Sequence, residues 1–392
     1  MGWIKFRVMR KKLCWFLSAG FIFFLTENVF SQNDDSLPVT RQEQVLLFSK
    51  IMNAQRTIWI HTPGGYGQSS ETYPVLYLLD GSIHFKYVSE MVEFLSNVER
   101  NRIPDMMVVA ILSDDRASDF TPIADSGIVS SGGGDRFLHF IQDELVPYVN
   151  AHYRTQPYRI LAAHSLGGLF ALYAKETAPG LFQSEILISP AFYGPNMKIY
   201  TGFPEFLKAH PQITGNMYIT IGNEPGPKGR IDSLAGYLKK FAPPGFRWAK
   251  NAYPEEDHFS LPYKSIYDGL KFIYADWFMN VWDSQNLLTN KEIEEQFRKL
   301  SIQFGYTIAP GEDFINACGY RQLNAKHFDQ AIELFRQNIK NHPTSYNVYD
   351  SMGEAYMDIG NTKLAIENYE ESIAINPRNE GGKRMLEKLR AH

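Results

Sequence analysis

The sequence predicts an α/β fold, a mostly parallel sheet flanked by helices, with a small all-α domain at the C-terminus. Two observations support this prediction. Between residues 44 and 278, short apolar runs alternate with amphipathic stretches of helical period, as strands and helices do when both faces of a parallel sheet are covered. From residue 314 onward the chain instead repeats itself at an offset of 34 residues, which is typical of stacked helix pairs.

The predicted elements of the sheet domain follow one another in a regular order. Residues 44–59 alternate apolar and polar side chains, which predicts an antiparallel hairpin. The run from Tyr73 to Gly81 is apolar on both faces and ends in Asp-Gly, as an interior strand of a parallel sheet would. Further strands are expected at 106–112, 158–164, 184–188, 216–221 and 246–253, helices at 85–100, at 135–151 and near Glu205, and a loop at 113–134.

The repeated segment matches the tetratricopeptide pattern. Six pairs of positions agree: Gly319 with Gly353, Ala331 with Ala365, Ile332 with Ile366, Phe335 with Tyr369, Ile339 with Ile373 and Pro343 with Pro377. Small residues where two helices cross, an aromatic on the facing helix and a proline after the second helix suit a stacked pair. The predicted parts are therefore a sheet domain at 38–283, a helical linker at 284–313 with a helix at Asn290–Phe304, and repeats with a terminal helix at 314–392.

The amino-terminal stretch predicts export. Five basic residues within the first twelve positions precede an apolar run from Leu13 to Leu25, and Val29 and Ser31 suit a cleavage site. The apolar run is shorter than the ~20 residues that a membrane span requires. We expect residues 1–31 to be a signal peptide, the protein to be periplasmic or secreted, and no membrane span to remain after cleavage. An uncleaved N-terminal anchor is the alternative.

Charge and cysteine content exclude several classes of function. The formal net charge of −4 argues against a nucleic-acid partner. Of the two cysteines, Cys14 lies in the predicted signal peptide, so Cys318 alone remains and no intramolecular disulfide can form. No Cys/His cluster has metal-ligand spacing, so we expect neither a metal nor another cofactor.

The stretch from Tyr158 to Thr177 predicts a nucleophile elbow. It combines a buried strand, a tight turn with Ser165 at its apex, and a helix that opens on Gly167 and Gly168. Small neighbours let strand and helix pass closely enough to expose a serine held in a strained conformation, as in the α/β-hydrolase fold. Ala163 stands where the usual pattern has its first glycine, which is a mild departure because alanine adds little bulk.

A serine nucleophile needs a histidine to accept its proton and an acid to orient that histidine. In an α/β-hydrolase the chain order is serine, acid, histidine. His258 follows the last predicted strand on a loop, whereas His210 ends a predicted helix, so we predict His258 as the base. Glu224 follows the preceding strand and is the predicted acid, with Asp232 in reserve.

The oxyanion that develops during acyl transfer needs two N–H donors. One is expected from the backbone of Leu166, at the start of the elbow helix, where the helix dipole also favours negative charge. The second is expected from the loop after the strand that ends at Asp80, hence from Gly81 or Ser82.

Across residues 44–278 the chain resembles the putative-esterase family of α/β-hydrolases, which includes enterobactin esterase-like enzymes and, more distantly, esterase D. The matching motifs are Tyr77-Leu-Leu-Asp-Gly-Ser, Arg116-Ala-Ser-Asp-Phe-Thr-Pro, Ala163-His-Ser-Leu-Gly-Gly, Ile221-Gly-Asn-Glu and Glu256-Asp-His. The resemblance implies Ser165 as nucleophile, His258 as base and Glu224 as acid, in agreement with the choices made from spacing. It does not imply one particular substrate.

Two further residues are candidates for substrate contact. Arg116 follows a strand and could reach an anionic group, or it could pair with Asp119. Tyr193 lies in a loop at 190–204 whose aromatic residues suit an aromatic or sugar-bearing substrate, or pack on their own core.

The combined hypothesis is an exported serine esterase that forms an acyl-enzyme on Ser165 and acts on a small-molecule ester, either a siderophore or a carbohydrate ester. An acyltransferase on the same fold is one alternative. The other is an interaction protein that binds a protein partner through the repeats and uses the hydrolase domain as a scaffold.

Overall fold

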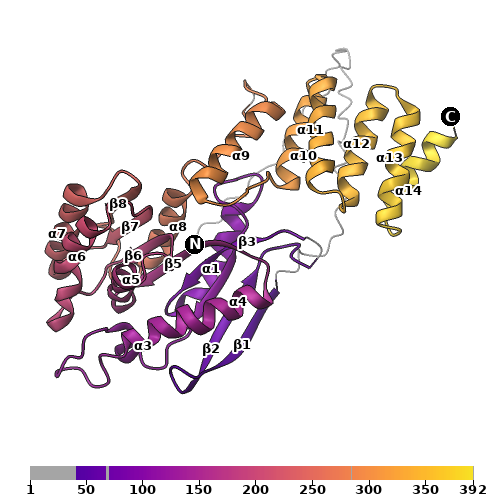
Figure 1. The fold of residues 1–392 in the computed structure, drawn as a ribbon. Coiled ribbons are helices and arrows are strands. Elements are labelled where there is room, and N and C mark those ends of the chain that lie inside the picture. The colour runs from indigo at the N-terminus through magenta and orange to yellow at the C-terminus, as the bar shows by residue number, and fades with distance from the viewer. Residues whose placement is uncertain (1–40, 68–69, 284, 392) are drawn as a thin grey trace, which may run out of the picture. The chain divides into compact units, whose positions relative to one another are not determined.

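The computed structural model describes residues 41–67, 70–283 and 285–391 (Figure 1), so the predicted signal peptide lies outside the described residues. Eight strands form one sheet in the order β1-β2-β4-β3-β5-β6-β7-β8. The strands are β1 Arg41–Ser49, β2 Ala54–Thr62, β3 Tyr73–Leu78, β4 Met107–Ile111, β5 Thr155–His164, β6 Ser184–Ile188, β7 Gly215–Ile221 and β8 Phe246–Ala252. Only β2 pairs antiparallel to its neighbours, with β1 and β4, and the other neighbouring pairs are parallel. The predicted α/β fold is confirmed.

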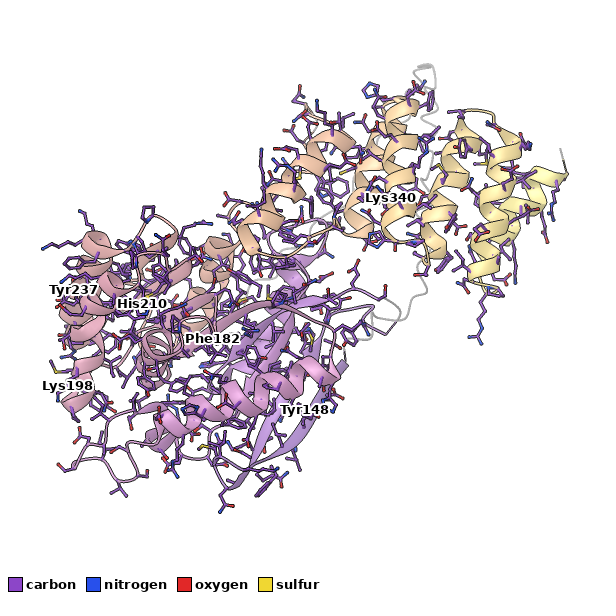
Figure 2. All side chains as sticks on the ribbon, viewed as in Figure 1. Tyr148, Phe182, Lys198, His210, Tyr237 and Lys340 are labelled. Carbon is purple, nitrogen blue, oxygen red and sulfur yellow. The ribbon has the colours of Figure 1, made fainter. Side chains whose placement is uncertain are left out.

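Helices cover both faces of the sheet. The helices of this part are α1 Gly81–Ser96, α2 Arg116–Phe120, α3 Gly134–His139, the π-helix η1 Phe140–Leu145, α4 Val146–His152, α5 Leu166–Thr177, the short 3₁₀ helix η2 Gly194–Asn196, α6 Met197–Ala209, α7 Pro225–Phe241 and α8 Leu261–Ile273. Side chains along β3 alternate between the two cores that result: Val75 and Tyr77 pack with α3 to α7, and Leu76 and Leu78 with α1 and α8. Burial on both faces explains why the central strands are apolar throughout. Figure 2 shows Phe182, which is buried in the first core, and Lys198, which is exposed.

Several elements differ from the sequence-based expectation, among them η2 and α6 within the expected loop at 190–204, the helices α7 and α8, and three elements that precede the elbow. The first helix begins at Gly81 rather than at residue 85, because Asp80 adopts a left-handed conformation and turns the chain directly from strand into helix. The loop at 113–134 contains α2, whose N-cap Asp115 accepts a hydrogen bond from the Ser118 amide. The helix expected at 135–151 contains a π-helical segment just before Pro147, which has no N–H for a regular turn.

The C-terminal region is helical and consists of α9 Asn290–Phe304, α10 Glu312–Asn324, α11 Phe328–Asn341, α12 Tyr346–Asp358, α13 Thr362–Ile375 and α14 Glu380–Arg390. The glycine and aromatic positions that repeat at an offset of 34 residues meet in space. A Cβ on Gly319 would lie 2.5 Å from the Phe335 ring, and one on Gly353 would lie 3.0 Å from the Tyr369 ring. Glycine therefore lets α10 approach α11, and α12 approach α13. The tetratricopeptide assignment and the boundaries at 283 and 313 stay predictions.

Helix α9 packs on the sheet domain through aromatic side chains. The Phe304 ring lies 5.0 Å from the rings of both Tyr158 and Tyr274, and Phe297 contacts Trp277 at 5.6 Å. Since these residues belong to the same buried cluster as α1 and α8, α9 completes the core on that face of the sheet. Among the described residues, no helix is both long enough and apolar enough to span a membrane.

Candidate active site

Ser165 lies at the apex of the turn between β5 and α5. Its φ of 58° and ψ of −115° are strained for a residue with a side chain, as the predicted elbow requires. The two glycines that follow permit the close approach: a Cβ on Gly168 would lie 3.0 Å from the backbone of Pro190. A Cβ on Gly167 would lie 3.5 Å from that of Ala163, an ordinary contact, so Ala163 fits in place of the usual first glycine.

His258 connects Ser165 to Glu224 through its two ring nitrogens. Its Nε2 lies 3.0 Å from the Ser165 Oγ, and its Nδ1 lies 2.6 Å from the Glu224 Oε2. The Ser189 hydroxyl donates a second hydrogen bond, of 2.9 Å, to the same carboxylate oxygen. This arrangement suits an imidazole that carries its proton on Nδ1 and accepts one at Nε2. Chemically, the three groups can activate the serine hydroxyl as a nucleophile.

The loops that carry Glu224 and His258 are tied together by the backbone. Glu224 follows β7, and the amide of Asn223 donates a 2.7 Å hydrogen bond to the carbonyl of Glu256 in the loop of His258. The contact is so close that a Cβ on Gly222 would lie 2.6 Å from the same carbonyl oxygen. The strand ends therefore set the spacing of the acid and the imidazole, and glycine is required at position 222.

The structure does not bring the alternative residues to Ser165. His210 lies at the C-terminal end of α6 (Figure 2). Its Nδ1 lies 2.8 Å from the Phe206 carbonyl oxygen and so is engaged within its own helix. Asp232 lies within α7, and its carboxylate pairs with Lys228 and Lys250. Two lysines therefore hold the Asp232 carboxylate, whereas Glu224 is the acid that contacts the imidazole of His258.

Arg116 pairs with Asp80, and the expected alternative of pairing with Asp119 is wrong. Its guanidinium donates to both oxygens of the Asp80 carboxylate, with distances of 2.6 Å and 3.0 Å. Asp119 instead pairs at 2.6 Å with the buried Arg56. Tyr193 lies at the N-cap of η2, where burial and the charge of Asp125 raise the pKa of its phenol and the charge of Arg116 opposes that rise.

Two buried histidines beside the site were missed by the sequence analysis. The His164 ring lies 4.4 Å from that of His258 and 6.1 Å from that of His84, measured between ring centroids. The Nε2 atoms of His164 and His84 are buried and have no hydrogen-bond partner among the described residues. Burial, reinforced by the charges of His258, His84 and Arg116, lowers the pKa of His164 to about 3. A histidine next to the predicted nucleophile was the signal that could have revealed it.

The low pKa of His164 predicts a pH-dependent loss of stability. The unfolded chain protonates this imidazole near its ordinary pKa of 6.5, whereas the folded protein keeps it neutral down to about pH 3. The contribution of His164 to the unfolding free energy is therefore fully present above the unfolded-state pKa and is lost as the pH drops below it. Between pH 8 and pH 5, wild type should lose about 2 kcal/mol more unfolding free energy than His164→Gln.

Urea denaturation of both proteins across this pH range measures that difference. The buried carboxyls of Glu176, Glu185 and Asp105 have raised pKa values, so they increase stability as the pH falls. Wild type and variant both contain them, so their contribution cancels in the difference between the two proteins. His139→Gln, at an exposed position, is the control and should follow wild type. Parallel curves for wild type and His164→Gln would contradict the prediction.

Comparison with known proteins identifies the family. Residues 49–267 match the family model described as putative esterase. The chain belongs to the putative-esterase family. This confirms the resemblance seen in the motifs and places the chain among the carboxylic ester hydrolases.

Individual relatives agree with the family assignment. The chain is 32% identical over 140 residues to the ferri-bacillibactin esterase of Bacillus subtilis, covering 31% of this chain and 48% of that one. It is 28% identical to the siderophore triacetylfusarinine C esterase of Aspergillus fumigatus, covering 41% and 65%. Both alignments span less than two thirds of the relative. Among solved structures, an IroE-like serine hydrolase from Shewanella oneidensis has a TM-score of 0.66 and 26% identity, covering 76% of this chain and 98% of that one.

Proposed function

We propose that the protein is a serine esterase that hydrolyses a siderophore ester through an acyl-enzyme on Ser165. The observation that carries the proposal is the chain of contacts from the Ser165 Oγ through both ring nitrogens of His258 to Glu224. The siderophore is favoured over a carbohydrate ester because the named relatives act on siderophores.

In the proposed reaction, the Ser165 Oγ bonds to the ester carbonyl carbon as its proton passes to the His258 Nε2. The amides of Leu166 and of Gly81 or Ser82 receive the oxyanion that forms. Breakage of the C–O bond then sends the proton from Nε2 to the departing alcohol. In the second half, Nε2 takes a proton from water, the hydroxide bonds to the acyl carbon, and the free acid leaves as the Ser165 Oγ regains its proton. Glu224 keeps the Nδ1 proton in place throughout.

A fluorophosphonate probe and a siderophore ester together test the proposal. The intact protein should take up one equivalent of the probe on Ser165, located by peptide mass spectrometry, and heat-unfolded protein should take up none. It should also release carboxylic acid from a cyclic siderophore lactone. Turnover of acetylated sugars but not of siderophore lactones would reassign the substrate, and a folded protein that neither labels nor turns over any ester would refute the proposal. An added alcohol that collects the acyl group in place of water would indicate the acyltransferase alternative.

We further propose export and a repeat domain, both from the sequence. Residues 1–31 serve as a signal peptide, and residues 314–392 form tetratricopeptide repeats that could hold a protein partner. Mass spectrometry of the mature amino terminus tests the first, with cleavage before Gln32 as the expected result. Retention of Met1 in the exported protein would indicate an anchor instead.

A further inference from the structure

The turn that follows β3 lies beside the nucleophile. Strand β3 pairs in parallel with β5: Leu78 lies opposite Ala162, and the Leu79 amide donates a 3.1 Å hydrogen bond to the Ala162 carbonyl. In the first turn of α1, the His84 ring lies 6.1 Å from the ring of His164, the residue before Ser165. Asp80 has a φ of 54° and a ψ of 42°, a left-handed conformation, and α1 begins with the next residue. Gly81 packs so closely that an added Cβ would lie 2.9 Å from that of Ala110. The first turn of α1 is therefore held against the sheet next to the elbow.

Asp80 occupies the N-cap position of α1 but does not cap it with its side chain. An aspartate at this position usually accepts a hydrogen bond from the amide two or three residues later, here Ser82 or Ile83. Instead, the amides of Ile83 and His84 bond to the Asp80 backbone carbonyl at 2.9 Å and 3.2 Å. Within the described part of the chain, the amides of Gly81 and Ser82 have no acceptor. They stay open at the positive end of a helix, where an anion is favoured.

Arg116 binds the carboxylate that an N-cap aspartate could otherwise use for capping. Its Nε lies 2.6 Å from one Asp80 carboxylate oxygen and its Nη2 lies 3.0 Å from the other, a two-point contact that fixes the orientation of the carboxylate. The Asp80 side chain is 3% exposed and that of Arg116 is 40% exposed. The guanidinium also lies 5.5 Å from the Phe120 ring, which helps to hold it in α2. The contact joins two segments that are 36 positions apart in sequence.

We propose that the Asp80–Arg116 pair is a positioning device for oxyanion stabilisation. Arg116 holds the Asp80 carboxylate away from the N-terminus of α1, and this keeps the Gly81 and Ser82 amides available to the oxyanion formed when Ser165 attacks the ester. Arg116 thus acts through Asp80 and not by contact with an anionic substrate. The proposal rests on the function proposed above and adds Asp80 and Arg116 as positioning residues for the oxyanion donors.

The variant Arg116→Gln is expected to lower kcat about 100-fold with little change in KM. The released Asp80 carboxylate can accept the Ser82 amide, as an N-cap aspartate does, and this places a negative charge where the oxyanion develops. Loss of one oxyanion donor costs about 10²–10³ in kcat in comparable enzymes. Arg116→Lys keeps the charge but not the two-point contact, so its kcat should fall between those of wild type and Arg116→Gln.

The double variant Asp80→Gly/Arg116→Gln separates this proposal from a substrate-binding role. Glycine adopts the left-handed conformation without strain and has no side chain to occupy the amides. We therefore expect the double variant to be at least about tenfold more active than Arg116→Gln alone. If Arg116 contacts an anionic group of the substrate instead, Arg116→Gln keeps the wild-type kcat on a neutral aryl ester, and the second substitution restores nothing.

Steady-state kinetics with p-nitrophenyl acetate and inhibition by phenyl trifluoromethyl ketone, which forms a tetrahedral adduct on serine, provide the readouts. Inhibitor affinity should fall in parallel with kcat in each Arg116 variant. Arg247→Gln is the matched control: its side chain is 38% exposed, pairs with Asp276 and lies 5.4 Å from a phenylalanine ring. It should retain wild-type kinetics.

Each result decides between the alternatives. A wild-type kcat in Arg116→Gln, with or without a rise in KM, or a double variant no faster than Arg116→Gln, overturns the positioning role while wild-type turnover still upholds the esterase. The proposed function is refuted separately, by a folded wild type that neither takes up the fluorophosphonate probe nor turns over any ester. If Arg116→Gln does not fold, as thermal melting would reveal, the comparison of Arg116→Lys with Asp80→Gly/Arg116→Lys gives the same test.

Discussion

Alanine at position 165 is expected to lower kcat about 10⁵–10⁶-fold, and glutamine at position 224 about 10⁴-fold. The serine provides the bond to the acyl group, so its loss leaves only binding and the oxyanion donors. Glutamine at 224 keeps the size of the acid but replaces the carboxylate that lies 2.6 Å from the His258 Nδ1 with a neutral amide. The amide does not stabilise the imidazolium that forms during the reaction. KM should change far less than kcat in both variants, and steady-state kinetics on an aryl ester measures both parameters.

The double variant Ser165→Ala/Glu224→Gln should be no slower than Ser165→Ala. Glu224 contributes only by orienting His258, and His258 contributes by accepting the proton of Ser165. Once the serine hydroxyl is removed, substitution of Glu224 therefore causes no further loss. Asp232→Asn and His210→Gln are the matched controls, since both residues are bound elsewhere, and each should retain wild-type kcat. An additive loss in the double variant would mean that Glu224 serves the reaction by another route.

The sequence predicted most of the fold because local patterns decide most of it. Helix α9 runs from Asn290 to Phe304 as expected, and its start is fixed by a capping box in which Thr289 and Glu292 bond to each other's backbone amides. The central strands were found because burial on both faces makes them apolar without interruption. The order of Ser165, Glu224 and His258 along the chain follows from the fold, so their meeting could be expected once the elbow was found.

The partner of Arg116 could not be predicted in the same way. Asp119 is three positions away in sequence and was the natural choice, yet it faces Arg56 on β2, 63 positions distant. Asp80 instead reaches Arg116 because β3 and β4 are parallel neighbours, so their carboxyl ends deliver both loops to one edge of the sheet. Contacts of this kind depend on which strands are adjacent, and composition and periodicity along one segment contain no information about that.

Replacement of Lys175 by methionine is expected to lower the unfolding free energy by about 3–5 kcal/mol. Lys175 of α5 and Glu185 of β6 form an ion pair at 2.8 Å, and each side chain is only 1% exposed. The ammonium also donates to the carbonyls of Phe182 and Pro179. Methionine fills a similar volume but leaves the Glu185 carboxylate buried without its counter-charge.

The double variant Lys175→Met/Glu185→Leu should recover most of this loss, because a buried pair replaced by apolar side chains is often neutral or stabilising. Urea denaturation at pH 8 measures all three proteins, with Lys208→Met on the exposed pair of α6 as the control that should change little.

The loss in Lys175→Met should also shrink as the pH falls. Burial already raises the pKa of Glu185 to about 7, and Lys175 opposes that rise, so removing the lysine raises the pKa further. A carboxyl with a raised folded-state pKa binds its proton more readily in the folded chain, so stability increases as the pH drops toward the unfolded pKa. At pH 5 the carboxyl of the variant is neutral, and the remaining deficit reflects the unpaired carbonyls and altered packing. A deficit that stays constant from pH 8 to pH 5 would show that the pair contributes through shape and not through charge.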